Sequence, residues 1–333
     1  MISTPCLMRL RQAQGYHIQL ANGFFNHLNM ALIALDKMQA SETQQQQFFD
    51  HYAKLFKPID QLPSTQSDTE TDLPIDRYFY QQLNDRGLKS VLSEVLPELL
   101  PRISALAFHG LIKLAYGILA DDKIEIAQSL ACWQQNDEPP LQMIDTGRES
   151  MDSTLIALSQ FEKLIPKPGG LITQRLLQIR ESGIIENHPQ AKLFNRLPID
   201  LNQQTLARTI LAFFRHSQDF TMLHTLTGFH ALRIVLDIVP QYQDDAIAYY
   251  WQAVIAAWLS TPLKPWNATP TRYQIAHHDA IAALQTIARQ SKNDHHVKLV
   301  YSCLSEYDHY DHEDYLWAAA ANLRLTRAPW QIV

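Results

Sequence analysis

The chain has 333 residues, of which 46% are hydrophobic and 19% are charged, and its formal net charge is −6. This composition is typical of a globular protein, and the negative charge without a basic stripe argues against a nucleic-acid-binding surface. The first residues lack the charged head and long apolar run of a secretory signal, and the uncharged run 246–263 contains Gln252, Ser260 and Pro262, so it predicts a core helix and no membrane span.

Cysteine and glycine usage limit the possible fold classes and indicate the cellular compartment. Cys6, Cys132 and Cys303 lie far apart and form no CxxC pair, so they predict free thiols in a reducing cytoplasm. Glycine occurs only 10 times. Few glycines mean few tight turns, which favours long helices over an all-β fold.

The first half of the chain shows helical periodicity, with apolar residues at spacings of three and four. Asn22 and Ser41 are candidate N-caps, and Gly87 is a candidate C-cap. Pro97 and Pro101 are expected to break the apolar run that starts at 91, so that a new helix begins near residue 102. The predicted elements are helices at 22–38, 41–56, 75–87, 102–119 and 123–135, with a polar surface loop at 61–74.

The second half begins with a looser stretch that contains "NDEPP" and "IPKPGG", and then returns to helical patterns. The predicted helices span 202–217, 220–239, 244–260, 272–291, 294–307 and 313–325. No alternating strand pattern of useful length is present. We therefore predict an all-α protein. Because candidate site residues come from both ends, we expect one large multi-helix domain over 1–333 with a central histidine-lined pocket.

The motifs of several enzyme classes are absent from the sequence. There is no GxGxxG fingerprint, no P-loop, no GxSxG elbow, and no HExxH or ExxH pair. The function must therefore be sought in scattered residues.

Three of the 14 histidines are lone imidazoles within apolar helical patterns: His27, His109 and His224. A buried imidazole needs partners, because an unpaired buried polar group costs roughly 1–3 kcal/mol. Each alone is most simply a core histidine with a hydrogen-bond partner, but three such helices together indicate a shared polar centre. Gly110 and Gly228 predict a close approach within two of these helices, for which ordinary helix packing is the alternative.

Four segments of the chain resemble the signatures of the questin oxidase-like proteins. They are "NHLNMALIAL", "AFHGLIKLAYGILADDKIEIAQSLACW", "LHTLTGFHALRIVL" and "DHHVKL", in this order between residues 26 and 299. The second segment is specific, whereas the others are short. The resemblance implies a Baeyer–Villiger-type oxygenase that inserts oxygen into a ring of an anthraquinone such as questin and opens it. It also implies dioxygen and a small aromatic molecule as substrates and NADPH as the electron donor.

Oxygen insertion requires dioxygen to be activated, which flavins or redox metals usually do. Imidazoles on converging helices suit iron, copper or zinc, and iron with an open position suits oxygen chemistry. We therefore hypothesise a mononuclear non-haem iron centre with His27, His109, His224 and His295 as ligands, and His109 as a residue essential for catalysis.

Lys298 shares a helix face with His295, three residues earlier, and not with His296. A buried ammonium beside four imidazoles would be repelled, and its pKa would fall. Two alternatives follow. Lys298 either lies at the rim and pairs with Asp294, or it has reacted with carbon dioxide to form a carbamate that serves as an oxygen ligand.

Aromatic residues near these histidines in the sequence are candidates for the wall of a pocket for a flat substrate. Tyr116 lies seven residues after His109 on the same helix face, and is also a candidate catalytic hydroxyl. His230, six residues after His224, is assigned to the edge of this pocket or to a pair with Arg233. The candidate pocket residues are Phe25, Phe108, Tyr116, Trp133 and His230.

Two other functions remain open at this stage. One is a helical scaffold with structural histidines, which predicts that the histidines diverge into separate patches. The other is a zinc-dependent hydrolase, which metal identity would distinguish, because zinc has no redox role. A homodimer is also left open.

Overall fold

A computed structural model describes residues 2–18, 25–56, 74–159, 170–188, 194–261, 273–274, 277–323 and 331–332. The described chain is helical, which confirms the all-α prediction. Its strands, Tyr273–Gln274 (β1) and Gln331–Ile332 (β2), form one short antiparallel pair. No described helix has the length and apolar character needed to cross a bilayer. That residues 1–333 form a single domain stays a prediction.

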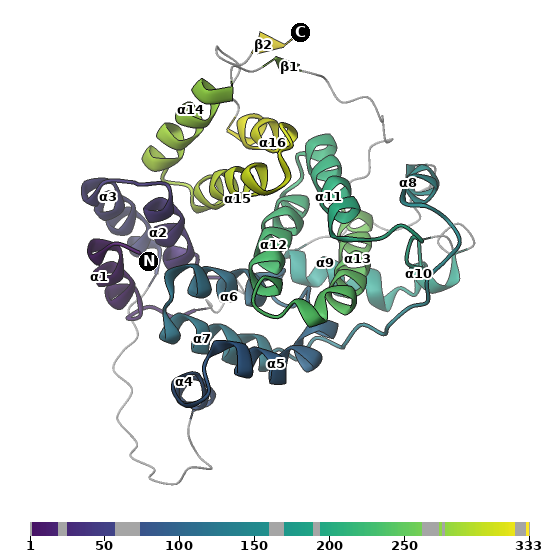
Figure 1. Cartoon of the computed structure of the whole chain (residues 1–333), viewed down its shortest axis with the longest axis horizontal. Coiled ribbons are helices and arrows are strands. Elements are labelled where there is room, and N and C mark those ends of the chain that lie inside the picture. The colour runs from purple at the N-terminus through teal and green to yellow at the C-terminus, as the bar shows by residue number, and fades with distance from the viewer. Residues whose placement is uncertain are drawn as a thin grey trace.

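The first half of the chain supplies a series of helices that begins beside the N-terminus in Figure 1. They are α1 (Thr4–Ala13), α2 (Leu28–Lys37), α3 (Glu42–Tyr52), η1 (Ala53–Leu55), α4 (Ile75–Asp85), α5 (Leu88–Leu99), η3 (Leu100–Arg102), α6 (His109–Ala120), α7 (Lys123–Gln134) and α8 (Met151–Ser159).

The second half supplies the remaining helices. They are α9 (Ile172–Glu181), α10 (Ile184–Asn187), α11 (Gln203–Ser217), α12 (Phe220–Leu236), η5 (Pro240–Tyr242), α13 (Gln243–Leu259), α14 (His277–Gln290), α15 (Asp294–Tyr310) and α16 (Asp314–Asn322).

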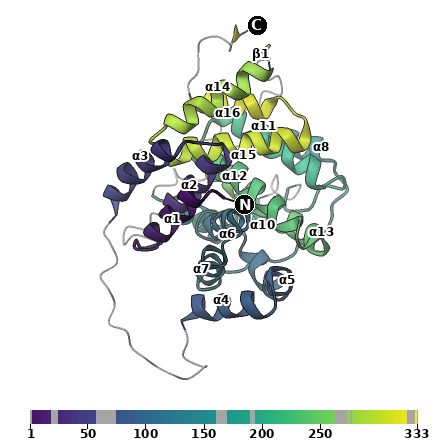
Figure 2. The same cartoon turned by 60° about the vertical axis from the view of Figure 1, so that its left-hand side comes forward.

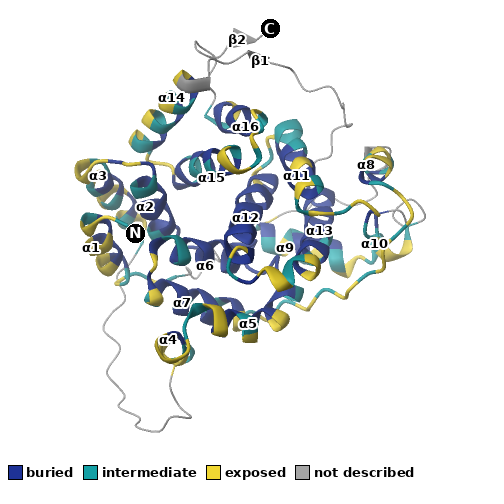
Figure 3. Ribbon diagram, viewed as in Figure 1, coloured by how far each residue is buried: buried dark blue, intermediate teal, exposed yellow. Residues whose placement is uncertain are grey.

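Helix α12 is the central element of the fold. Every residue from Thr221 to Leu236 is buried, and α12 packs against α6, α11, α13 and α15. Figure 3 shows α12 and α13 buried along most of their length, whereas α1, α3 and α4 carry exposed faces. Both Figure 1 and Figure 2 place α14, α15 and α16 on one side of the molecule and α4, α5 and α7 on the opposite side. The N-terminal helix α2 packs against α15, so distant parts of the sequence meet near α12.

Several predicted helix ends are confirmed by capping geometry. The Ser41 side chain accepts a hydrogen bond from the backbone N–H of Gln44 in a full capping box. Gly87 follows α4 with a φ of 78° and a ψ of 162°, a positive-φ conformation that glycine adopts without strain. Asn22 and most of the predicted loop 61–74 lie outside the described residues.

The predicted break at Pro97 is wrong, because α5 continues through this proline to Leu99. Proline has no N–H, so the carbonyl of Ser93, four residues earlier, loses its helical partner. The hydroxyl of Tyr242 donates a hydrogen bond to that carbonyl at 2.7 Å. A partner from another element therefore satisfies the group that the proline leaves free.

The next helix also begins later than predicted. Helix α6 starts at His109 and not near residue 102, because Leu106, Ala107 and Phe108 adopt φ angles of 56°, 57° and 68°. Left-handed conformations cost non-glycine residues roughly 1–2 kcal/mol each. Three in succession therefore store strain directly before a candidate ligand.

The two helical glycines mark close approaches, as predicted, and both approaches are helix packing. A Cβ atom on Gly110 would lie 2.7 Å from Cγ of Trp133. A Cβ atom on Gly228 would lie 2.6 Å from the hydroxyl of Tyr250 and 3.1 Å from Cβ of Phe108. These contacts hold α6 and α12 against their neighbours.

Candidate metal centre

Four imidazoles meet in the core, each from a different helix. The ring centroids of His27 and His109 are 4.6 Å apart, those of His109 and His224 5.0 Å, those of His224 and His295 5.3 Å, and those of His295 and His27 4.7 Å. The four rings thus form a closed circuit of contacts. This convergence is opposite to the separate patches that the scaffold alternative predicts.

Each histidine lies at the N-terminal end of its helix. His27 precedes α2, His109 opens α6, His224 lies in the first turns of α12, and His295 is the second residue of α15. Helix N-termini carry a partial positive charge of roughly half an elementary charge. The region where these ends meet therefore favours anionic groups.

The Nδ1 atom of every imidazole faces an oxygen acceptor. His27 and His295 donate to the same carboxylate oxygen of Asp294, the latter at 3.0 Å. His109 donates to the carbonyl of Leu106, and His224 donates to the carbonyl of Phe220 at 2.8 Å. Because these oxygens only accept, the proton of each neutral ring is on Nδ1, and Nε2 carries the lone pair.

Protonation of the free nitrogens is disfavoured. Burial lowers the pKa of all four histidines, that of His27 to about 3, and the nearby charge of Lys298 acts in the same direction on each ring. The Nε2 atoms of His27 and His109 lie 2.6 Å apart, a distance that two lone pairs tolerate only with a proton or a cation between them, and Nε2 of His295 is buried without a hydrogen-bond partner. Neutral imidazoles with unshared lone pairs are the form that binds metal ions.

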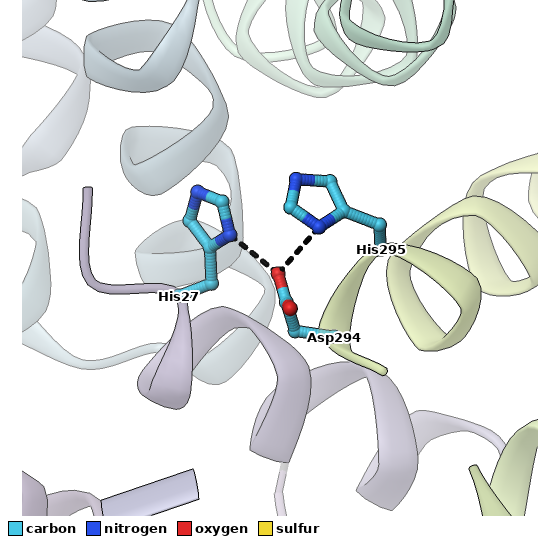
Figure 4. Close-up of side chains that lie close together, drawn as sticks. All are labelled: His27, Asp294 and His295. Atoms are coloured by element: carbon cyan, nitrogen blue, oxygen red, sulfur yellow. Dashed lines mark hydrogen bonds and ion pairs between the residues drawn. The ribbon is translucent and has the colours of Figure 1, made fainter. Parts of the chain in front are cut away.

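Asp294 holds two of the four rings in place, as Figure 4 shows. In this view the second nitrogen of both His27 and His295 points away from the carboxylate. Burial raises the pKa of Asp294, but the hydrogen bonds from His27 and His295 and the charge of Lys298 outweigh it and hold the pKa well below its usual range. His27, Asp294 and His295 also have donor atoms within 4.8 Å of one another, so the carboxylate itself is an alternative ligand. Its hydrogen bonds to both Nδ1 atoms favour the orienting role.

Replacing Asp294 with asparagine is expected to weaken metal binding by roughly 10–100-fold, the usual cost of losing an outer partner of a ligand histidine. The uncharged amide orients two imidazoles less firmly and no longer fixes their proton on Nδ1. Metal affinity should be measured by competition with a chelator. Asp308→Asn is the matched control, since Asp308 is an exposed residue of the same helix. Equal affinities of Asp294→Asn and the parent protein would contradict the orienting role.

Lys298 lies behind the imidazoles and not at a rim. It is 3% exposed, and its Nζ lies 3.7 Å from the carboxylate of Asp294. Burial lowers its pKa to about 8, and Asp294 opposes this shift. The predicted rim position is therefore wrong, whereas the predicted pair with Asp294 is present.

A cavity of about 240 Å³ lies beside the four imidazoles. Its apolar wall comprises Phe25, Leu106, Ala107, Leu171, Ile172 and Phe220. Phe25 stacks on His109 with ring centroids 4.8 Å apart, and Phe220 meets His224 edge-on at 4.6 Å. Arg175 of α9 also lines the cavity. The predicted pocket is thus adjacent to the histidines, but only Phe25 of its five predicted wall residues contributes to the lining.

The structure places Phe108, Trp133 and Tyr116 elsewhere in the core. Phe108 packs against Tyr250, and the indole of Trp133 donates a hydrogen bond to the carbonyl of Arg102 at 3.0 Å. Tyr116 lies beside Tyr301, and its burial raises the pKa of the phenol. Seven residues along a helix correspond to roughly 10 Å, so a shared face with His109 did not bring Tyr116 to the cavity.

His230 belongs to a second buried polar cluster between α12 and α15. Its Nδ1 lies 2.7 Å from Glu306, which also accepts a hydrogen bond from Arg233 at 2.9 Å. The sequence predicts that His230 lies either at the edge of the pocket or beside Arg233, and in the structure it lies beside Arg233. Asp294, Lys298, Ser302 and Glu306 follow one another at intervals of four along the buried face of α15. This stripe connects the second cluster to the histidines.

Sequence reasoning missed Phe220, Leu106 and Arg175. Phe220 could have been found, because it precedes His224 by four residues and therefore shares its helix face. Leu106 contributes a backbone carbonyl in a left-handed turn, for which its side chain gives no signal. Arg175 reaches the site only through the packing of α9.

The model of the family described as Questin oxidase-like matches residues 24–180. The matched part includes His27, His109 and Arg175, whereas His224, His295 and Lys298 follow it. No curated protein gives a significant match. The family indicates an oxidoreductase that acts on aromatic substrates. The match confirms the resemblance found in the sequence, and residues 24–180 are similar to the questin oxidase-like family.

Proposed function

We propose that this protein is an oxygenase that inserts oxygen into, or cleaves, a ring of an aromatic or quinone-type substrate bound in the 240 Å³ cavity. In this proposal the Nε2 atoms of His27, His109, His224 and His295 hold one non-haem iron ion. The observation that carries the proposal is that all four Nδ1 atoms face oxygen acceptors, while the four rings contact one another in a closed circuit, so that the Nε2 atoms are the nitrogens left for a metal.

The proposed reaction requires iron rather than zinc. Imidazoles bind both ions and catalytic zinc sites also keep an open position, but zinc has no redox chemistry, whereas iron with an open position suits reaction with dioxygen. Bound iron would supply the electron transfer that dioxygen requires. The family assignment also favours oxidation over hydrolysis. Copper would satisfy the same nitrogen donors, so metal identity must be measured.

The side chains of the cavity would bind and orient the substrate. Phe25 and Phe220 offer flat surfaces beside the imidazoles, and aromatic rings stack on such surfaces at centroid distances of about 4.5–7 Å. Leu171 and Ile172 line the same cavity, and an apolar wall excludes water from it. NADPH as electron donor is implied by the resemblance and is part of the proposal.

Lys298 is the candidate for an anionic fifth donor. Four neutral imidazoles do not offset the charge of a metal ion, and the nearby helix N-termini add positive potential. An amine with a pKa of about 8 is partly uncharged near neutral pH, and an uncharged amine adds to carbon dioxide. The reaction forms one N–C bond and releases one proton, and the carbamate carries one negative charge. The alternative is an ammonium that remains paired with Asp294 at 3.7 Å.

The test is metal analysis combined with oxygen uptake. Protein produced with iron is expected to contain about one equivalent by elemental analysis, with anomalous scattering at the four imidazoles, and to consume dioxygen when questin and NADPH are added. A metal-free preparation with full activity would refute the iron centre. Zinc at the site together with hydrolysis would favour the hydrolase, and metal-free protein without activity would favour the scaffold.

A further inference from the structure

The cavity is lined by an arginine whose Nε has no hydrogen-bond partner. Arg175 lines the cavity, and its Nε is buried without an acceptor among the described residues. A buried N–H of a charged group destabilises the protein when it has no hydrogen-bond acceptor. The side chain is therefore arranged for an acceptor that comes from outside the described chain.

Arg175 is also the one formally charged side chain among the described residues that line the cavity. The carboxylate of Asp294 is taken by His27, His295 and Lys298 and does not line the cavity. The helix N-termini that meet at the imidazoles add to the positive potential. The electrostatics of the cavity therefore select an anion.

The rest of the wall selects an aromatic body. Phe25 and Phe220 flank the imidazoles, and Leu171 and Ile172 continue the apolar surface towards α9, which carries Arg175. A ligand that fits this lining has a flat apolar ring system next to the histidines and an oxyanion at the end that reaches Arg175. Guanidinium groups bind carboxylates through two parallel hydrogen bonds.

We propose that Arg175 is a substrate-binding residue that recognises an aromatic oxyanion, a carboxylate or a phenolate, and so fixes which end of the substrate faces the histidines. This inference relies on the proposed function only for the cavity being the substrate site. It requires no bound metal, so it can be tested separately.

The test uses binding of model anions by the full-length protein. 2-Naphthoate and its neutral analogue 2-naphthalenemethanol are titrated calorimetrically into the protein as purified and again after dialysis against a chelator. The parent protein should bind the carboxylate about tenfold or more tightly than the alcohol, because it pairs a buried charge. Arg175→Leu should lose this preference and bind the alcohol as the parent does. Arg175→Lys should retain part of the preference.

Matched controls separate recognition from folding. Arg148→Leu removes an exposed arginine and should bind both probes like the parent. Arg175→Gln replaces Arg175→Leu if the latter fails to fold. 4-Nitrophenolate is titrated at a pH at which it is ionised. Its affinity relative to that of 2-naphthoate distinguishes a phenolate site from a carboxylate site.

Several results of these titrations would contradict anion recognition by Arg175. Equal binding of 2-naphthoate by the parent and Arg175→Leu would overturn it, as would no binding of either probe by the parent. Carboxylate binding that disappears on chelation but survives Arg175→Leu would assign the anion to the metal and overturn it too. An anion preference that is retained after chelation would support Arg175 independently of the iron centre, which the metal analysis tests.

Discussion

His109→Ala is expected to reduce metal content and oxygenase activity by roughly 100-fold or more. Loss of a residue that only orients a ligand histidine weakens metal binding by roughly 10–100-fold, and loss of the ligand itself should cost at least as much. The imidazole contacts His27 on one side and His224 on the other, so its removal opens the circuit of donors. The fold should persist, because the surrounding helices can accommodate one cavity, although a loss of about 2–5 kcal/mol in unfolding free energy is expected for such a truncation. Elemental analysis, oxygen uptake and circular dichroism measure these effects.

His51→Ala is the control for this experiment. His51 lies at the exposed end of α3, and a surface substitution usually changes stability by less than about 0.5 kcal/mol. This variant should match the parent in metal content and activity. A folded His109→Ala protein that retains full metal and activity would remove His109 from the site.

Lys298→Ala is expected to have a comparably large effect if the carbamate forms. The variant lacks the anionic donor, and it also leaves Asp294 without its cation at 3.7 Å. Metal content and activity should fall together, and added formate or acetate should partly restore both by placing a carboxylate in the vacated space. Depletion of carbon dioxide from the parent protein should produce the same loss reversibly.

Two comparisons distinguish the carbamate from the ion pair. Lys292→Ala removes an exposed lysine just before α15 and should be silent. Lys298→Met keeps the apolar stem without the amine, so it separates packing from chemistry. A high-resolution map with density that ends at Nζ would contradict the carbamate and leave the ion pair with Asp294.

The identity of the buried histidines was predictable, because a lone imidazole in an apolar helical pattern must find a partner. The sequence could not show that His27, His109, His224 and His295 all lie at helix N-termini around one point, since this depends on how four helices pack. The predicted wall residues are helix neighbours of the histidines. This prediction is wrong for Tyr116, because successive residues on one helix face lie further and further along the helix axis from a site at the helix end.

Backbone features were the hardest to foresee. The left-handed turn at residues 106–108 contains no glycine that would indicate it in the sequence, and Phe108 in this turn packs closely against Gly228 of α12. The sequence predicts a helix break at Pro97 because the missing hydrogen bond is a local property, whereas the compensation by Tyr242 comes from another element. The sequence therefore indicates which buried polar groups need hydrogen-bond partners, whereas the identity of those partners depends on the tertiary structure.

The distribution of the four imidazoles along the chain has a consequence for biosynthesis. His27 and Asp294, which hydrogen-bond in the folded protein, are 267 residues apart in sequence. At a synthesis rate of roughly 5–20 residues per second, the ribosome needs about 13–53 s between these two residues. During that interval a nascent chain presents His27 and His109 without the groups that complete their surroundings. If the four imidazoles bind iron, the full donor set exists only after α15 has been synthesised and has docked, so iron loading would report the docking of α15.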